Sequence, residues 1–431
     1  MKPHQSSLVL LGTCSLSLIP GTLYASGFAL IEQSASGLGT AFAGSAVAAN
    51  DASVQFFNPA GLVDLDSAQI SVAGHAIDFR SRFSDRASAL PPAGLGLLPT
   101  GAREDDGGNL QGVPNLYLSL PATPRVALGL GVNAPFGLRT RYADPWIGRF
   151  QGIDTKLTTI NVNPAVAYRI TGSLSIGAGV DYQQADAVLT NAVMLGLATE
   201  GRARLDVSDH AWSWNAGLAF AAPGGMRVGL SYRARVTYDL HGETTVSTTS
   251  GIAVPAVSGP TRAPLTLPDS ATLSVSFPLA ERWTFYGDLS YTQWSRIKQI
   301  VASNPATGLP RDTLQFQFSD AWRYAFGAAY HASEHWTVRY GAAWDQSPVK
   351  DAYRTVRLPD DDRIWASVGA QWVPSDNWAI DAGYAHLFLN NARINQTRAQ
   401  LGAPAAFSSI VAGEYDSSVD ILSLQLTYRI K

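Results

Sequence analysis

The sequence is poor in cysteine and in charge. Of its 431 residues one is cysteine, Cys14, and 15% are charged, with 31 basic and 34 acidic residues and a net charge of −3. The lack of a basic excess argues against nucleic acid as a partner. Glycine, tryptophan and tyrosine are plentiful instead, a bias that suits lipid-facing strands with aromatic girdles.

The sequence also lacks a continuous apolar run of the length that a spanning helix needs. The apolar run 8–19 is short, follows Lys2 and His4, and precedes the small-residue site Leu23-Tyr24-Ala25. This pattern predicts that residues 1–25 are a secretory signal peptide and not a membrane anchor. Because Cys14 lies inside it, we expect the mature protein to have neither a disulfide nor thiol chemistry.

From about residue 67 to residue 431, apolar side chains recur at every second position. Leu422, Leu424 and Leu426 alternate with Ser423 and Gln425, and the same period appears at 174–182 and 336–345. Short turns alternate with long connections, approximately 81–111, 134–153, 187–210, 241–268, 296–319, 346–361 and 390–417. Together these features predict an all-β fold, a transmembrane antiparallel β-barrel of about 14 strands with short periplasmic turns. Six tryptophans near strand ends are predicted to lie at the membrane interfaces: Trp283, Trp336, Trp344, Trp365, Trp372 and Trp378.

Residues 26–66 do not alternate, and they predict a partly helical hatch that plugs the lumen. Leu38, Phe42 and Ala46 recur at helical spacing. Asn58 can cap the following helix start, and Pro59 suits its first position, before Ala60. The cap either locks the hatch in the lumen or is only a local cap.

Several motifs in this order resemble the outer-membrane long-chain fatty acid and hydrocarbon transporters of the FadL/TodX type. They are Ser26-Gly27-Phe28-Ala29-Leu30, Ser36-Gly37-Leu38-Gly39, Phe57-Asn58-Pro59-Ala60, Pro135-Phe136-Gly137-Leu138, Trp146-Ile147-Gly148-Arg149, 157–164, Trp214-Asn215-Ala216-Gly217 and 359–365. The resemblance implies passive uptake of a hydrophobic ligand across the outer membrane. The ligand would be captured at outer loops, pass to a hatch pocket and leave sideways at a kink in the third strand.

Transferred to this chain, the resemblance assigns candidate residues to each step. Gly129 and Gly131, in the third strand at 125–133, are the candidates for the kink, although glycine is common elsewhere in the barrel. The candidates for the pocket are Phe28, Phe42, Phe56 and Phe57, which could equally pack within the hatch. The predicted loop 187–210 is apolar for an outer loop, so it is expected to form a wall of the capture groove, or a lid, through Val188, Leu189, Val193, Met194, Leu195 and Leu197.

Fatty-acid members of the family are expected to place basic groups near the ligand carboxylate. The fifth strand and its exit, 182–187, contain no lysine or arginine. Arg149 and Lys298 remain as possible carboxylate partners, with Arg202 and Arg204 behind them. This departure keeps open a second possibility, uptake of neutral monoaromatic or alkane hydrocarbons.

Other functions fit the sequence less well. Its histidines are scattered and none lies in a nucleophile motif, so we expect no enzyme, and no cofactor is predicted. Asp360-Asp361-Asp362 is interpreted as a solvated acidic turn and not as a metal site. A general porin needs an open polar lumen, which an apolar hatch would close. A hydrophobic small molecule and outer-membrane lipid are the expected partners, and nothing requires more than a monomer.

Overall fold

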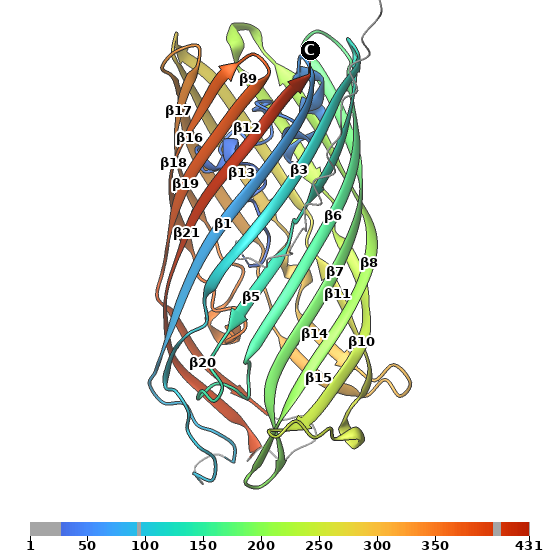
Figure 1. Cartoon of the computed structure of the whole chain (residues 1–431), viewed down its shortest axis with the longest axis vertical. Helices are drawn as coiled ribbons and strands as arrows, with labels where there is room; N and C mark the ends of the chain where they lie inside the picture. The colour runs from blue at the N-terminus through green and yellow to red at the C-terminus, as the bar shows by residue number, and fades with distance from the viewer. Residues whose placement is uncertain (1–26, 93–95, 400–406, 431) are drawn as a thin grey trace, which may run out of the picture.

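A computed structural model describes residues 27–92, 96–399 and 407–430 of the chain. The predicted signal peptide, 1–25, lies outside these residues. The described part forms a tall, closed antiparallel β-barrel, with the N-terminal segment inside it (Figure 1). None of the helices in these ranges is both long and apolar enough to cross a bilayer.

The strand segments have the following bounds: β1 (Ala68–Asp85), β2 (Glu104–Asp106), β3 (Asn109–Thr123), β4 (Val126–Asn133), β5 (Gly137–Arg141), β6 (Asp154–Arg169), β7 (Leu174–Gly196), β8 (Thr199–Ala221), β9 (Arg227–Arg233), β10 (Val236–Thr248), β11 (Gly259–Leu267), β12 (Ser270–Ala280), β13 (Trp283–Thr292), β14 (Gln299–Ser303), β15 (Pro310–Gln315), β16 (Ala321–His331), β17 (Trp336–Asp345), β18 (Arg363–Ser375), β19 (Trp378–Leu389), β20 (Ala392–Arg398) and β21 (Ser409–Ile430). The helical segments are α1 (Ala35–Leu38), α2 (Val54–Phe57), η1 (Pro59–Asp64), η2 (Pro223–Gly225), η3 (Pro255–Val257), η4 (Trp294–Arg296) and η5 (Asp351–Tyr353).

These segments make a barrel of 14 strands, as the alternation predicts. In the described ranges, seven pairs of consecutive segments continue each other along one barrel strand, for example β4 with β5 as the third. The barrel closes where β1 pairs with β21, from Ala68 opposite Ile430 to Asp85 opposite Gly413. Closure pairs the first barrel strand with the last, so neither end of the sheet faces lipid as an open edge.

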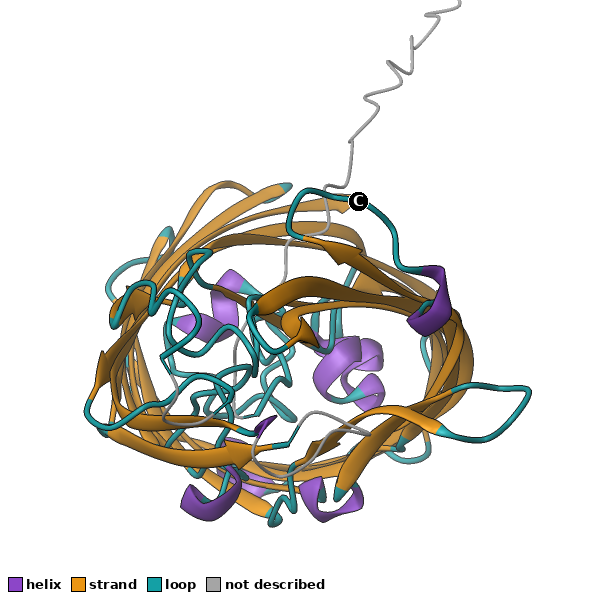
Figure 2. Cartoon of the chain, turned by 90° about the horizontal axis from the view of Figure 1, so that it is seen from below, coloured by secondary structure: helices purple, strands orange, loops and turns teal. Residues whose placement is uncertain are grey.

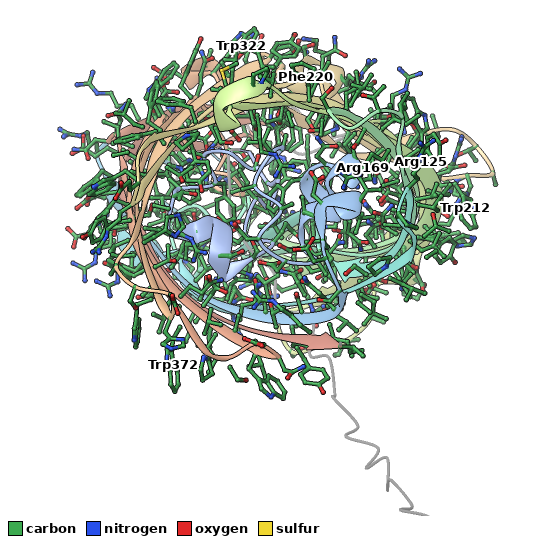
Figure 3. The ribbon with its side chains drawn as sticks, turned by 90° about the horizontal axis from the view of Figure 1, so that it is seen from above. Arg125, Arg169, Trp212, Phe220, Trp322 and Trp372 are labelled. Atoms are coloured by element: carbon green, nitrogen blue, oxygen red, sulfur yellow. The ribbon has the colours of Figure 1, made fainter. Side chains whose placement is uncertain are left out.

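The two faces of each strand differ as the period-two pattern requires. On β21, Leu422 and Leu424 are both 62% exposed on the outside, whereas Ser423 and Gln425 are buried in the lumen. Figure 3 shows Trp212, Trp322 and Trp372 pointing away from the barrel. Trp336, Trp344 and Trp378 are also exposed, and Trp283 is half-buried, but the prediction for Trp365 is wrong. Its indole is buried in the lumen, at right angles to the Phe42 ring.

The N-terminal segment fills the lumen towards the end of the barrel that carries the short turns and the C-terminus (Figures 1 and 2). Its short helices α1, α2 and η1 lie within the ring of strands. Arg169 of β6 holds it at this end by an ion pair of 3.0 Å to Asp64. We call residues 27–65 the hatch.

The hatch rests directly against glycines of the barrel wall. At each of these positions a Cβ atom would overlap a hatch atom, so only glycine permits the contact. Five of these contacts involve Gly177, Gly217, Gly229, Gly341 and Gly369. Their spread over five strands indicates that the barrel wall is shaped to hold the hatch in one position.

Candidate functional site

An apolar pocket of about 80 Å³ lies in the lumen next to the N-terminal end of the hatch. Phe28 contributes from the hatch, and the rest of the lining comes mainly from β5 to β8, β10, β11, β14 and β15. Apolar lining residues include Leu138, Leu157, Leu189, Leu240, Leu265 and Phe316. A concave apolar site of this kind suits a hydrophobic ligand.

The pocket arises because the inward face of the strands changes character along their length. On β7 the inward side chains are Asp181 and Gln183 beside the hatch, and then Ala185, Ala187 and Leu189 beyond it. The polar part surrounds the hatch and the apolar part surrounds the pocket. The sequence shows these apolar residues at every second position, but the prediction did not use this pattern to locate the pocket.

Arg357 lies at the edge of the apolar pocket, and sequence reasoning missed it. Its guanidinium is buried and donates to neutral oxygens only, among them Thr155 Oγ1 at 2.9 Å and Asn191 Oδ1 at 3.1 Å. Its Nε has no partner among the described residues. Burial lowers the pKa of Arg357 to about 9, yet the group stays protonated at neutral pH. A buried cation without a paired carboxylate can therefore accept an anionic group from a ligand.

A second, outer cavity of about 160 Å³ adjoins the apolar pocket at the mouth of the barrel. The two share Leu189, Leu205, Ala302 and Asp312 in their linings. Arg398 forms an ion pair with Asp312 at this boundary. The shared residues place the two cavities next to each other, with the outer one towards the mouth.

The wall of the barrel is interrupted at the third barrel strand. The pairing of β3 with β4 ends where Leu116 faces Val132, and on this side the β3 residues 109–115 have no strand partner in the described structure. The second and third barrel strands meet again where the Arg141 N–H, at the end of β5, donates to the Gly107 carbonyl, between β2 and β3, at 3.0 Å. The result is a bounded window in the sheet.

Residues 134–136 make this window by turning out of the strand into the lumen. Asn133 pairs with Asn161 and Gly137 with Thr158, so the third barrel strand holds one more residue here than β6 opposite. The hatch covers the turn from inside, with the Leu30 N–H donating to the Pro135 carbonyl at 2.8 Å. Such an extra residue is a β-bulge, which bends the strand that carries it.

The kink is therefore not at Gly129 and Gly131, where it was predicted. Both glycines lie in β4, which pairs without interruption on both sides at these positions. Their small size serves the hatch instead, because the Gln55 carboxamide lies where their Cβ atoms would be. Gln55 is fully buried.

The four predicted pocket phenylalanines divide among three places. Phe28 lines the apolar pocket. Phe56 and Phe57 line a different cavity, on the far side of the hatch's N-terminal segment. Phe42 packs between Phe57 and the wall residue Trp365, as a hatch core residue would.

The Asn58 side chain caps η1, as predicted. Its Oδ1 accepts from the Ala60 N–H at 3.0 Å, and Pro59 occupies the first turn. Its Nδ2 donates to the carbonyls of Ala46 in the hatch, at 2.7 Å, and Leu218 in the barrel, at 2.9 Å. The cap therefore also ties the hatch to β8.

The prediction of a loop at 187–210 is wrong, because β7 and β8 continue through these residues to a tight hairpin. Leu189 lines both cavities near the mouth and Val193 lines the outer one. Met194 packs with Phe150 outside the pocket. Val188 and Leu195 are half-buried, and Leu197 is 63% exposed at the tip.

The two predicted carboxylate partners are used elsewhere. Arg149 is fully buried within the outer loops, in an ion pair of 2.9 Å with Glu200 and in hydrogen bonds to backbone carbonyls. Lys298 is exposed and donates to the Phe318 carbonyl at 3.1 Å. Neither lines the apolar pocket.

The acidic turn is not solvated as predicted. Asp360 is buried and accepts from the Ser347 hydroxyl at 2.6 Å and from the Gly27 N–H at 3.1 Å, while it pairs with Arg363. It therefore fixes the start of the hatch. The described residues contain no cluster suited to a metal ion.

Comparison with known proteins agrees with this geometry. Residues 16–430 match the family model described as outer membrane protein transport protein (OMPP1/FadL/TodX). The chain is 32% identical over 424 residues to outer membrane protein P1 of Haemophilus influenzae, covering 90% of each chain. It is 28% identical over 424 residues to the long-chain fatty acid transport protein of Escherichia coli K12, covering 89% of this chain and 92% of the relative.

Solved structures show the same fold. A Pseudomonas aeruginosa FadL homologue superposes with a TM-score of 0.85 at 23% identity, over 94% of this chain and all of that one. The Pseudomonas putida toluene transporter TodX superposes with a TM-score of 0.68 at 15% identity, over 88% and 94%.

Proposed function

The chain belongs to the OMPP1/FadL/TodX family of outer membrane proteins, non-enzymatic transporters of hydrophobic compounds, and we propose that it takes up hydrophobic molecules that carry a carboxylate. Long-chain fatty acids are the representative class. The observation that carries this proposal is Arg357, a buried cation that forms no ion pair in the described structure, at the edge of a mainly apolar pocket whose lining also includes Lys156 and Asp312. A relative of this chain is named a long-chain fatty acid transport protein, which supports the same class.

The proposed path begins at the outer cavity, where a ligand reaches a mixed surface of Phe150, Phe407 and Arg311. It then moves inward along the shared wall to the apolar pocket. There the acyl chain contacts the leucine-rich wall and the carboxylate pairs with Arg357. Burial of each methylene contributes about 0.8 kcal/mol, so a long chain favours the pocket over water.

The proposed exit is the window at the third barrel strand. The hatch segment closes it from inside through the hydrogen bonds of Leu30 to Pro135 and of Asn115 to the Glu32 carbonyl, at 2.8 and 3.0 Å. A ligand therefore leaves only after this segment moves. A general porin is disfavoured, because the hatch rests on the wall at five glycines around the lumen.

Uptake measurements on a variant with a filled pocket test the proposal. Ala263 is 2% exposed and lines the apolar pocket, so a tryptophan there occupies the ligand's space. In cells lacking their own transporter of this type, Ala263→Trp should abolish uptake of a labelled long-chain fatty acid that the wild type supports. Ala76→Trp, on the lipid-facing side of β1, is the matched control and should transport normally. Unchanged uptake by Ala263→Trp at equal surface expression would refute the pocket's role.

A further inference from the structure

A third cavity, of about 150 Å³, lies beyond the apolar pocket and is distinct from the outer cavity. It is bounded by hatch residues 29–31, by Phe56 and Phe57, and by the walls of β8, β9, β12, β13 and β16. It shares no lining residue with the apolar pocket. Pro135 and Phe136 of the window turn also line it, but the proposed function assigns no ligand to it.

Three aromatic rings separate the two cavities. Phe28 lines the apolar pocket, whereas Phe136 and Trp294 line the third cavity. The Phe28 ring meets Trp294 edge-on with centroids 4.8 Å apart, and both meet Phe136 at 6.3 Å. Edge-to-face contacts of this kind make a closed partition without covalent or hydrogen-bonded ties.

The wall opposite these rings is polar. The hydroxyls of Ser231, Ser270 and Thr292 line the cavity, and in the described structure none of them has a hydrogen-bond partner. Asn215 also lines it, and its Oδ1 is buried without a partner. Ser231 and Asn215 are buried, and Ser270 and Thr292 are half-buried. Because buried polar groups are normally satisfied, free ones around a cavity suit a polar ligand.

The same wall carries both signs of charge, on Arg323 and Asp345, and also on Arg233, which is already paired with Asp181 at 2.8 Å. Arg323 is 7% exposed, and its Nη2 donates to the Ala41 carbonyl at 2.7 Å, while Nε and Nη1 have no partner among the described residues. A carboxylate attracted by Arg323 would meet the negative charge of Asp345. A pure hydrocarbon would leave the unpaired polar groups of this wall unsatisfied. A neutral hydroxyl both donates and accepts hydrogen bonds, so it suits this wall better than a carboxylate or a hydrocarbon does.

The volume of the cavity limits the size of the ligand. An engineered protein cavity of about 150 Å³ holds one benzene ring. One side of this cavity is aromatic and the other carries hydroxyl, amide and charged groups. We propose that it is a second ligand site, for a compact aromatic alcohol of the phenol class, whose ring packs on Phe57 and Trp294 while its hydroxyl bonds to the β12 and β13 wall.

The site extends the proposed function to a second class of cargo. A phenol is small enough to pass the aromatic partition when Phe28 swings aside, whereas a long acyl chain stays on the apolar side. The two sites have separate walls, so either assignment can fail while the other holds.

Equilibrium dialysis of labelled phenol against the full-length folded protein in detergent tests the site. We expect saturable binding of one phenol per chain, weakened at least fivefold by Ser270→Ala combined with Thr292→Val. Ser276→Ala is the matched control, because Ser276 faces the lumen on the same strand outside the cavity and should bind as the wild type does. Heat-modifiable migration on gels confirms that each variant is folded.

Competition decides between the two sites. An excess of long-chain fatty acid should leave phenol bound, and Ala263→Trp should bind phenol normally although it loses fatty acid. Toluene, which has the ring without the hydroxyl, should displace phenol poorly. Displacement of phenol by fatty acid, loss of phenol binding in Ala263→Trp, equal affinity for toluene, or absence of saturable binding would each overturn the proposal.

Discussion

The Asn58 carboxamide lies against Gly217 of β8, where the side chain of any other residue would be. From this position Asn58 bonds to Ala60 and Ala46 within the hatch and to Leu218 in the wall. One side chain thus caps a helix, links two hatch segments and ties them to the barrel. The contact depends on a glycine in the wall as much as on the asparagine in the hatch.

Gly217→Ala should loosen the hatch, because its methyl group would overlap Asn58 Oδ1. Overpacking of this kind costs about 1–3 kcal/mol. We expect faster proteolysis of the hatch and ionic current in planar bilayers. Gly74→Ala is the control, since a methyl group there meets nothing within 4 Å. Equal behaviour of the two variants would show that the hatch does not need this contact.

Asn58→Ala should loosen the hatch without overpacking. It removes one cap bond and two bonds to carbonyls, and each is worth about 1 kcal/mol. Proteolysis of the hatch should accelerate while the barrel keeps its thermal midpoint, measured by circular dichroism. If the hatch of this variant resists protease as the wild type does, the asparagine is an incidental cap.

Deleting Ala134 should close the window in the barrel wall. The third barrel strand holds one residue more than β6 between their flanking pairs, and the deletion lets the strand pair continuously. Fatty-acid uptake by cells should fall at least tenfold, about 1.4 kcal/mol or more in barrier height. Ala134→Ser keeps the chain length and serves as control. Full uptake by the deletion variant would place the exit elsewhere.

The seating of the hatch should depend on pH through Glu32. Its side chain is fully buried in the hatch, and its two oxygens have no partner in the described structure. Burial raises the pKa of Glu32 to about 7, against the opposing attraction of Arg363 and Arg323 and with added repulsion from Asp345. Glu32 therefore keeps its proton in the seated hatch at pH values where the released hatch loses it. The seated hatch becomes less stable relative to the released hatch as pH rises from about 4.5, the ordinary pKa, to about 7.

Glu32→Gln, which stays neutral, should remove this dependence. The ratio of hatch cleavage rates, wild type over variant, cancels the effect of pH on the protease itself. We expect a ratio near one at pH 4 and about tenfold or more at pH 8. A ratio that does not change between the two pH values would mean that Glu32 stays charged or is satisfied by water.

The barrel was predictable from sequence because alternation reports which side of a strand faces lipid. The lengths of the strands were not, since beyond the membrane the outward side chains become polar while inward ones such as Ala187 and Leu189 become apolar. In these outer parts of the strands the apolar side chains lie on the inward face. The sequence pattern of a lipid-facing strand is therefore missing, and the segment was predicted as a loop. Turn chemistry at Asn58 and Pro59 is local, and it was predicted correctly.

The polar partners were less predictable because they join distant parts of the chain. Arg149 lies in a motif with a family resemblance, yet Glu200, 51 residues away, pairs with it. Gly129 and Gly131 signal close approach of another segment as readily as a bend, and sequence does not distinguish the two. Arg357 meets the β6 residue Thr155, 202 positions earlier, which only the closed barrel reveals.

We propose that Arg357 selects a hydrophobic ligand that carries a carboxylate. Uptake of a labelled long-chain fatty acid and of labelled toluene at low concentration tests it in cells that express the wild type, Arg357→Met or Arg149→Met without another transporter of this type. We expect Arg357→Met to lower fatty-acid uptake at least tenfold and to leave toluene uptake unchanged, because a charge-assisted hydrogen bond to the carboxylate is lost. Fatty-acid uptake by Arg357→Met equal to that of the wild type would contradict it.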